Sequence, residues 1–594
     1  MATIIPTTGW WRYLNPGPFN IKEHTAIVIM SSTASSVAIA MEVIAAIDLF
    51  YNVSLNGAVA VFQIFASQML GYGIAGILRT LLVYPTYAFY PTYISVVNLL
   101  QSLHFSGTLN SKRSFSTSWT LITQGNPLVW PLQTQINSYL GMAIGYLVLT
   151  LCYYNNVFGA RDLVFMSTSL FGKDGKVYNQ TAILTPEYSL DPSKLQEIGL
   201  PRYTTTYVVS QICYNLSLGA AIVHVFLWHW DDLKRAFGGL RFLKGAQDID
   251  DPHYQQMKKY PEVPQWWYLL LFIISLGVGI GCSYTTGEAL LPWWSILLFT
   301  ALSCLIAVCL GFIAATTGFQ ISIKYAIQVL AAFDTSRKTN CGDVREPVRE
   351  QYGLSDFGPA SRSQAWAVYQ TSSASNVFQS PSHILIDMRE IDHSSLSHCP
   401  EPCWLGSTLI VMQSIVSNNR EVLLDPVGTR VWSGWIIQQY NSASVAMGAL
   451  GKDLFTFGKP YWLVPFSIFI GLLLPIPFWL IHKFTRRGSL PSKIAAYINT
   501  PILSLYVGYL PYSVNGQWWS CVLIGFASQW WARTRRPKWF KAKNYLLSAA
   551  LDGGSQVILF ILSFAVFGAS GNAISFPNWW GNPSNLSADR CAST

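Results

Sequence analysis

The sequence predicts an all-α polytopic membrane protein: a bundle of transmembrane helices with broken or re-entrant helices and the internal repeats of secondary transporters. Of its 594 residues, 51% are hydrophobic and only 11% are charged, whereas a soluble chain carries about 25% charged residues. Nine apolar stretches are also long enough to cross a bilayer, and several shorter ones end at proline or glycine. The whole chain, 1–594, is therefore expected to form a single transmembrane transporter domain.

Each predicted span is an apolar run of about the 20 residues that a helix needs to cross the hydrocarbon layer. These runs lie near 25–50, 57–83, 136–157, 204–230, 264–286, 289–314, 461–482, 514–532 and 545–568. Shorter apolar runs lie near 84–104, 316–333, 402–416 and 496–512. Proline or glycine at their ends, such as Pro501 and Pro511 in the last run, predicts broken or re-entrant helices.

Lysine and arginine are concentrated in three connecting segments, which indicates how the chain is oriented. These segments are 231–262, 483–493 and 533–543, and the positive-inside rule places all three in the cytoplasm. One span before the first lies the loop 160–203, which contains the sequon Asn179-Gln180-Thr181. One span after the last lies the tail with Asn585-Leu586-Ser587. Both sequons then fall outside, which agrees with the chemistry of N-glycosylation.

The composition argues against several functional classes. The formal net charge of +9 arises from Lys and Arg in the connecting segments, so no nucleic-acid partner is expected. The ten cysteines have no Cys-x-x-Cys or Cys/His spacing, so the sequence predicts no metal site and no cofactor. The hydrolase motifs His-Glu-x-x-His, Gly-x-Gly-Asp and Gly-x-Ser-x-Gly do not occur, and an enzyme is not expected.

A stiff, charged loop precedes the first predicted span. It reads Asn15-Pro16-Gly17-Pro18-Phe19-Asn20-Ile21-Lys22-Glu23-His24. Two prolines and a glycine in four positions exclude a helix or a central strand. Irregular backbone is tolerated at membrane depth only where protein or a water-filled cavity covers it. The loop is therefore interpreted as part of a permeation path, with a helix cap and snorkelling charges as the alternative.

These ten residues closely resemble a hallmark of the oligopeptide transporter (OPT) family, in its peptide-transporting branch. Similar stretches extend over most of the chain, including Asn126-Pro127-Leu128, the run 260–267, Leu291-Pro292-Trp293-Trp294, Asn499-Thr500-Pro501, the run 510–515 and the run 549–553. The resemblance implies a secondary active, proton-coupled transporter at the plasma membrane that imports small oligopeptides. Its substrates would be tetrapeptides, pentapeptides or glutathione-like peptides.

One segment departs from the family pattern. The second hallmark, a Lys-Ile/Leu-Pro-Pro-Arg loop, is absent, and residues 334–410 are polar, Ser-rich and charged instead. Such a composition is typical of a disordered regulatory loop. Back-translation suggests another explanation, because a one-base shift lets residues 365–377 encode L-G-Q-Y-T-K-L-P-P-R-A-M-F. The hypothesis is that residues 334 to about 378 are translated out of frame, and the coding DNA tests it: the +1 frame must contain K-L-P-P-R.

Two further departures suggest missing pieces. The family carries about two spans before the Asn-Pro-Gly-Pro loop, whereas this chain starts 14 residues before it. Ser/Thr-rich sequence between His104 and Trp119 stands where the family has more membrane helices. The chain is therefore expected to be truncated at its N-terminus, and an inactive product of a damaged or misannotated transporter gene remains an alternative.

Ionisable residues inside predicted spans are functional candidates by default. Glu42 and Asp552 are candidates for binding the peptide amine, while Lys22 is a candidate for its carboxylate. His24 beside Glu23 is the best candidate for the proton-binding pair, because neighbouring opposite charges shift both titrations. For Asp48, Arg79 and His224, capping or snorkelling at the interface is the favoured interpretation.

The expected partners are therefore a small peptide, protons and the lipid bilayer, with the proton gradient as the energy source. A metal–chelate or siderophore-type substrate, used by the other branch of the superfamily, is the near alternative. No residue pattern determines which peptides are carried, the proton stoichiometry or the oligomeric state.

Overall fold

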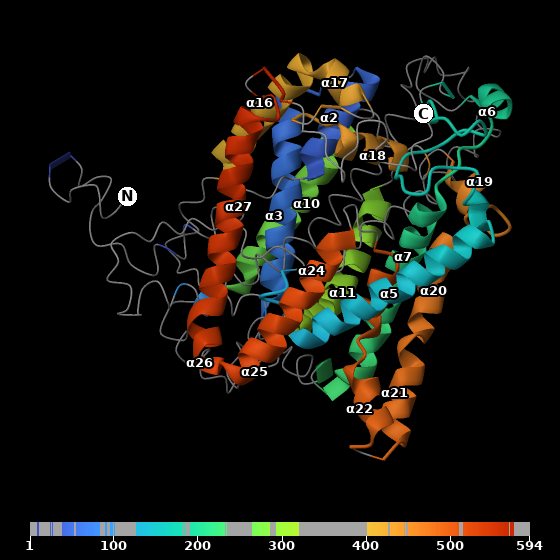
Figure 1. The fold of residues 1–594 in the computed structure, drawn as a ribbon. Coiled ribbons are helices and arrows are strands. Elements are labelled where there is room, and N and C mark those ends of the chain that lie inside the picture. Colours follow the sequence, from blue (N-terminus) through green and yellow to red (C-terminus); the bar gives the residue numbers. More distant parts are fainter. Residues whose placement is uncertain are drawn as a thin grey trace.

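The computed structural model describes most of the predicted membrane domain. The residues that it describes are 39–52, 55–82, 126–180, 191–231, 264–285, 293–319, 401–425, 431–444, 450–486, 488–509 and 515–569, with a few isolated positions between them. Within these ranges the regular structure is helical, apart from isolated bridges that Phe171 forms with Val177 and Arg202. The all-α fold class is thus confirmed (Figure 1).

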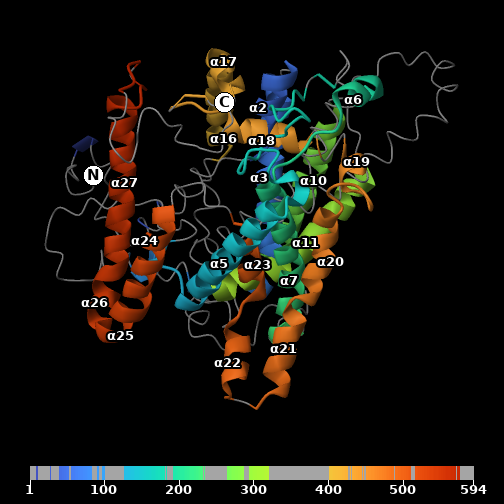
Figure 2. The same ribbon diagram turned by 45° about the vertical axis from the view of Figure 1, so that its right-hand side comes forward.

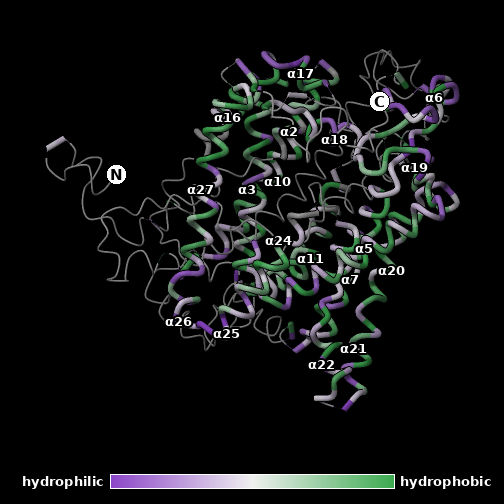
Figure 3. The backbone as a smooth tube through the Cα atoms, in the orientation of Figure 1, coloured by the Kyte–Doolittle hydropathy of each residue, from purple (hydrophilic) through white to green (hydrophobic). Residues whose placement is uncertain are grey.

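Seven described helical segments are long and apolar enough to cross a membrane. They are Gly57–Arg79, Leu132–Tyr154, Thr205–Trp228, Gln265–Cys282, Ile296–Thr317, Leu463–Phe484 and Pro537–Ala565. Figure 3 shows apolar residues along these helices and polar residues near the two ends of the bundle, as at α6, α17, α25 and α26. Their lengths match the hydrocarbon thickness of a bilayer, and the protein is an integral membrane protein.

For two other predicted spans, the described helix is shorter than the predicted span. The predicted span 25–50 corresponds to α2 (Ile39–Tyr51), and the span 514–532 corresponds to α24 (Asn515–Gly525) with the π-helix η6 (Phe526–Ala532). The predicted short run 402–416 lies within α16 (Glu401–Asn418), an 18-residue helix at the end of the polar segment 334–410.

Helix α7 (Thr205–Trp228) lies at the centre of the bundle and is buried over most of its length (Figure 2). It packs along α20 (Leu463–Leu473), which continues through Leu474 into α21 (Pro475–Phe484). A Cβ on Gly219 would overlap the carbonyl oxygen of Ile468, and a Cβ on Gly471 would overlap that of Leu216. Glycine on both helices therefore permits a very close backbone approach, as is common between membrane helices.

The bundle also contains a short helix bounded by breaks. Helix α22 (Leu490–Tyr497) ends two residues before α23 (Thr500–Val507) begins, and α23 packs between α5 (Leu132–Tyr154) and α7. A Cβ on Gly141 or Gly145 of α5 would overlap backbone oxygens of α23. This discontinuous helix corresponds to the short run that the sequence places near 496–512.

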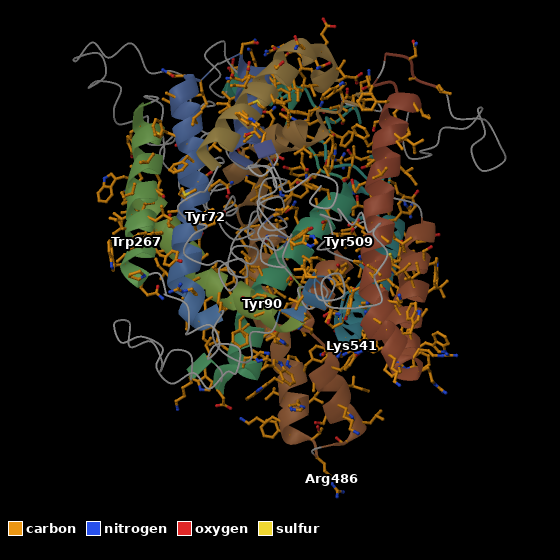
Figure 4. All side chains as sticks on the ribbon, turned by 90° about the vertical axis from the view of Figure 1, so that its left-hand side faces the viewer. Tyr72, Tyr90, Trp267, Arg486, Tyr509 and Lys541 are labelled. Atoms are coloured by element: carbon orange, nitrogen blue, oxygen red, sulfur yellow. The ribbon has the colours of Figure 1, made fainter. Side chains whose placement is uncertain are left out.

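Helices α3 (Gly57–Leu82) and α10 (Gln265–Thr285) form a second closely packed pair. Gly73 and Gly76 of α3 lie against Phe272 and Tyr268 of α10. The opposite face of α10 is exposed, and Figure 4 shows its Trp267 pointing away from the bundle. This apolar face suits contact with lipid. Helix α11 (Trp293–Thr317) packs against both α3 and α7.

The C-terminal part forms a helical hairpin beside the bundle. After α24 and η6 the chain passes through α25 (Arg533–Arg535), α26 (Pro537–Trp539) and the π-helix η7 (Phe540–Asn544) into α27 (Tyr545–Ala565). The turn 126–130 anchors this hairpin, because Gln529 Nε2 and Asn544 Nδ2 donate hydrogen bonds to Leu128 O at 2.5 and 2.8 Å. Asn126 Nδ2 also donates to Ser548 Oγ at 2.9 Å.

The two ends of the bundle differ in character. One end carries the segment 157–203 with the 3₁₀-helix η2 (Val157–Gly159) and α6 (Pro192–Ile198), as well as α17 (Arg420–Leu424), α18 (Trp435–Ser444) and α19 (Gly451–Phe455). The opposite end carries α22, α25 and α26 (Figure 1), with Arg486 at the tip of the α21–α22 hairpin (Figure 4).

Candidate functional site

The loop that the sequence places on the permeation path lies outside the described residues. This holds for Asn15, Pro16, Gly17, Pro18, Phe19, Asn20, Lys22 and Glu23. His24 is described only as an isolated, half-buried position. The pairing of His24 with Glu23 and the role of Lys22 therefore remain predictions.

The two other candidate carboxylates lie on different helices. Glu42 is half-buried in the first turn of α2, and Asp552 is half-buried on α27. Figure 2 shows α27 standing apart from α2, so the described part of the structure does not bring the two carboxylates together. Their proposed contact with a peptide amine remains a prediction for each residue separately.

The favoured interface interpretation is wrong for two of the ionisable residues. Arg79 is only 6% exposed, and its guanidinium carbon lies 5.2 Å from the centre of the Tyr268 ring on α10. His224 is only 7% exposed, its ring lies near those of Trp228 and His229, and its Nδ1 has no hydrogen-bond partner. Helix packing buries both side chains within the protein, where a snorkelling group would reach the interface instead.

A polar stripe on α7, formed by Gln211 and Asn215, faces α20 in line with Gly219. Residues four apart lie on one face of a helix, so their spacing aligns them. Asn215 Nδ2 donates a hydrogen bond to Val464 O at 2.8 Å. Gln211 is 4% exposed, and its Oε1 has no hydrogen-bond partner. An unpaired buried acceptor is costly, so this oxygen is available to a ligand or a water molecule.

A small aromatic cavity lies at the end of this polar stripe. We use this name for the space lined by Tyr203, Tyr207, Val208, Gln211, Phe455, Tyr461 and Val464. The Tyr203 amide donates to the Tyr461 hydroxyl at 2.9 Å, which joins the start of α7 to the start of α20. Burial raises the pKa of Tyr461 above its ordinary value, so its hydroxyl stays neutral and can also donate. The cavity thus combines aromatic surface with an unpaired amide oxygen.

The break between α22 and α23 presents a second set of polar groups. Asn137 of α5 bridges it: its Nδ2 donates to Tyr497 O at 3.0 Å, and its Oδ1 accepts from the Asn499 amide at 2.8 Å. Asn499 caps α23, because its Oδ1 accepts from the Ile502 amide at 3.3 Å. The buried hydroxyl of Thr500, in the first turn, has no hydrogen-bond partner.

Such an arrangement has the properties of a substrate site in a transporter. The N-terminus of a half-helix carries a partial positive charge that favours an anionic group. The unpaired Thr500 hydroxyl adds a donor beside it. Among the described residues, no group of three or more His, Cys, Asp or Glu is placed to hold a metal ion.

The comparisons with known proteins agree with this architecture. The sequence profile described as "OPT oligopeptide transporter protein" matches residues 1–119, 107–339 and 404–566. The chain belongs to the oligopeptide transporter (OPT) family. The matched stretches leave out residues 340–403, so within the polar segment 334–410 the family pattern is interrupted over these residues.

Curated OPT relatives align with nearly the whole chain. Oligopeptide transporter 1 of Arabidopsis thaliana is 28% identical over 659 residues, covering 98% of this chain and 83% of the relative. Oligopeptide transporter 5 of the same plant is 26% identical, covering 98% and 84%. Oligopeptide transporter phomP2 of Diaporthe leptostromiformis is 25% identical, covering 100% and 81%. The 659-residue alignment exceeds the 594 residues of this chain, so that relative carries residues that this chain lacks.

Several residues of the candidate site were not singled out by sequence reasoning. Asn499 and Thr500 belong to a stretch that resembles the OPT family, but their spacing alone suggests only a helix cap. Gln211 and Asn137 are isolated amides in apolar helices. A polar residue inside a predicted span is the signal that could have identified these positions, but only ionisable residues were treated as candidates.

Proposed function

We propose that this protein is a secondary active transporter that imports small oligopeptides across the plasma membrane, coupled to protons. The observation that carries the proposal is the discontinuous α22–α23 helix inside an OPT-family bundle. Its unpaired Thr500 hydroxyl, at the positive end of the α23 dipole, is suited to a peptide carboxylate. The relatives named oligopeptide transporters support the substrate class. Tetrapeptides, pentapeptides and glutathione-like peptides fit this proposal.

The aromatic cavity is too small for a peptide in this conformation, but the unpaired Gln211 oxygen on its lining is available to a water molecule. A cycle of transport requires that substrate and proton bind one conformation better than the other. The Glu23–His24 pair is the proposed proton-binding group. Glu42 or Asp552 is the proposed partner of the peptide amine, and Lys22 is a second proposed partner for the peptide carboxylate.

The test is uptake of a labelled tetrapeptide by the full chain reconstituted in proteoliposomes. We expect an imposed inward proton gradient to drive accumulation and a protonophore to abolish it. Uptake that is indifferent to the gradient would contradict proton coupling but leave peptide transport intact. Competition by a metal chelate but not by peptides would favour the metal–chelate alternative.

A pair of matched variants tests the proposed carboxylate site. Thr500→Val removes the unpaired hydroxyl at nearly constant volume, and we expect a several-fold rise in KM for the peptide. Thr150→Val makes the same change on α5, where the exposed hydroxyl only donates to Tyr146 O of its own helix. Equal effects of both variants would rule out a specific role for Thr500.

A second candidate is an inactive transporter product, and one observation favours it. The family matches stop at residue 339 and resume at 404, and most of the segment proposed to be translated out of frame, 334 to about 378, lies in this gap. Polar backbone inserted into a bilayer without partners would be destabilising. Uptake by a frame-corrected version but not by this chain would support this candidate, whereas robust uptake by this chain would exclude it.

A further inference from the structure

The described residues of the segment 157–203, which are 157–180, 182–183 and 191–203, pack over the end of the bundle. Leu170, Tyr178 and Ile183 are buried in one cluster with residues of α7 and α20. The Tyr178 hydroxyl donates to Gly199 O at 2.8 Å, which closes the segment on itself. The sequon residue Asn179 comes next in the chain, so the packing of Tyr178 restrains its backbone.

Asn179 is exposed, although it lies between two residues that pack against other parts of the chain. Tyr178 before it is buried. The next residue, Gln180, is docked on α18: its Nε2 donates to Ser442 Oγ at 2.5 Å, and its Oε1 accepts from Asn441 Nδ2 at 2.8 Å. A substituent on Asn179 therefore projects outward without disturbing the packing beneath.

The charges of the two ends place Asn179 on the non-cytoplasmic side. The segments 483–493 and 533–543 contain four and six Lys or Arg within eleven residues each. The segment 157–203 contains five Lys or Arg within 47 residues. Figure 1 shows α6, within 157–203, at the end opposite to α22, α25 and α26. The positive-inside rule then puts Asn179 in the compartment where N-glycosylation occurs.

We propose that Asn179 carries an N-linked oligosaccharide. The donor class is a lipid-linked pyrophosphate oligosaccharide. Asn179 Nδ2 forms a bond to the anomeric carbon of the sugar and loses one proton, while the bond from that carbon to the phosphate oxygen breaks. The lipid pyrophosphate leaves with the bonding electrons, so the step needs neither an oxidant nor a reductant.

The structure also distinguishes Asn179 from two other sequons. Asn215-Leu216-Ser217 lies within α7, where Asn215 is 2% exposed and its Nδ2 already donates to Val464 O. Asn52-Val53-Ser54 lies in the short connection between α2 and α3, and Asn52 Oδ1 accepts a hydrogen bond from Arg420. A sequon inside a span, or in the five residues that separate two membrane helices, stays too close to the bilayer to reach an enzyme whose active site stands outside it.

The test is synthesis of the full-length chain with microsomes derived from the endoplasmic reticulum. The Asn585→Gln variant removes the sequon of the tail, so that any remaining glycan reports on the other sites. We expect this variant to show one mobility shift that peptide-N-glycosidase F reverses. Adding Asn179→Gln or Thr181→Val should abolish the shift, whereas adding Asn52→Gln or Asn215→Gln should leave it unchanged.

The opposite results would overturn the proposal. If the Asn585→Gln variant shows no shift, no other sequon carries a glycan. If it keeps its shift after Asn179→Gln is added, the glycan is attached at another site. Oligosaccharide is transferred to the emerging chain, so the readout does not depend on the stability of the folded variant. It is also independent of peptide uptake, because it reports orientation and accessibility alone.

Discussion

The Asn499 amide donates a 2.8 Å hydrogen bond to the Asn137 side-chain oxygen, and this pair joins α5 to the break between α22 and α23. The same Asn137 side chain donates to Tyr497 O on the other side of the break. One buried amide thus satisfies a donor and an acceptor that the interrupted helix leaves without intrahelical partners. The relationship explains how a discontinuous helix is tolerated inside the bundle.

Replacing Asn137 by leucine should destabilise the protein. The buried Asn499 amide loses this partner, while the Tyr497 carbonyl keeps the hydrogen bond from Gln133 Nε2. For the unsatisfied Asn499 amide we expect a cost of about 2 kcal/mol. Thermal unfolding in detergent measures the loss. Asn155→Leu is the matched control, because Asn155 is exposed and donates only to Leu151 O of its own helix. Equal melting temperatures for the two variants would contradict the bridging role.

Enlarging Gly471 should separate α7 from α20. A Cβ at this position overlaps the Leu216 carbonyl oxygen, so Gly471→Val must displace backbone, at about 1 to 3 kcal/mol. We expect a lower melting temperature and reduced uptake of peptide. Gly281→Val on α10 is the control, since its Cβ meets nothing within 4 Å. If Gly471→Val left the melting temperature and the uptake of peptide unchanged, the close approach of α7 and α20 would not be required.

Substitutions of Gln529 and Asn544 should have non-additive effects on the stability of the protein. Both donate to the carbonyl of Leu128, at 2.5 and 2.8 Å, so either one alone keeps this acceptor satisfied. We expect Gln529→Leu to cost less alone than it costs in the Asn544→Leu background. A double-mutant cycle on melting temperature measures this coupling, and strictly additive shifts would contradict a shared acceptor.

Arg420→Ala should cost more stability than Asp48→Asn. Arg420 Nη1 lies 3.4 Å from Asp48 Oδ1, an ion pair that is part exposed and therefore weak. Its Nη2 also donates to the carbonyls of Asp48 and Leu49 at 2.6 and 2.8 Å and so caps the C-terminus of α2. We expect about 1 kcal/mol more for the arginine variant in thermal unfolding, and a larger effect of Asp48→Asn would reverse this assignment.

The fold class could be predicted from the sequence because membrane-spanning helices have a distinctive local composition. A run of about 20 apolar residues has few alternatives to a spanning helix, as in α7 and α11. The break near Pro501 was also predictable, since proline at the start of a helix and asparagine before it are local signals. The OPT resemblance of Asn499-Thr500-Pro501 likewise needed no structure.

The side-chain environments could not be predicted in this way. Arg79 and His224 lie near the ends of predicted spans, where snorkelling is the ordinary expectation, but helix packing buries both. Asn137 and Asn499 are 362 positions apart in sequence, and nothing local indicates that they meet. The face that a uniformly apolar helix turns toward its neighbours depends on those neighbours, not on its own periodicity.

By itself, the sequence determined that this chain is a helical membrane protein of the OPT lineage, which end of the bundle is basic and where a helix breaks. These properties follow from composition, charge and short motifs, all of which act over a few residues. The tertiary structure alone decided that Asn137 bridges the break, that Gln211 faces an aromatic cavity and that Asn179 points outward from a packed segment. Each of these depends on contacts between distant parts of the chain, and such contacts form only when the helices pack together.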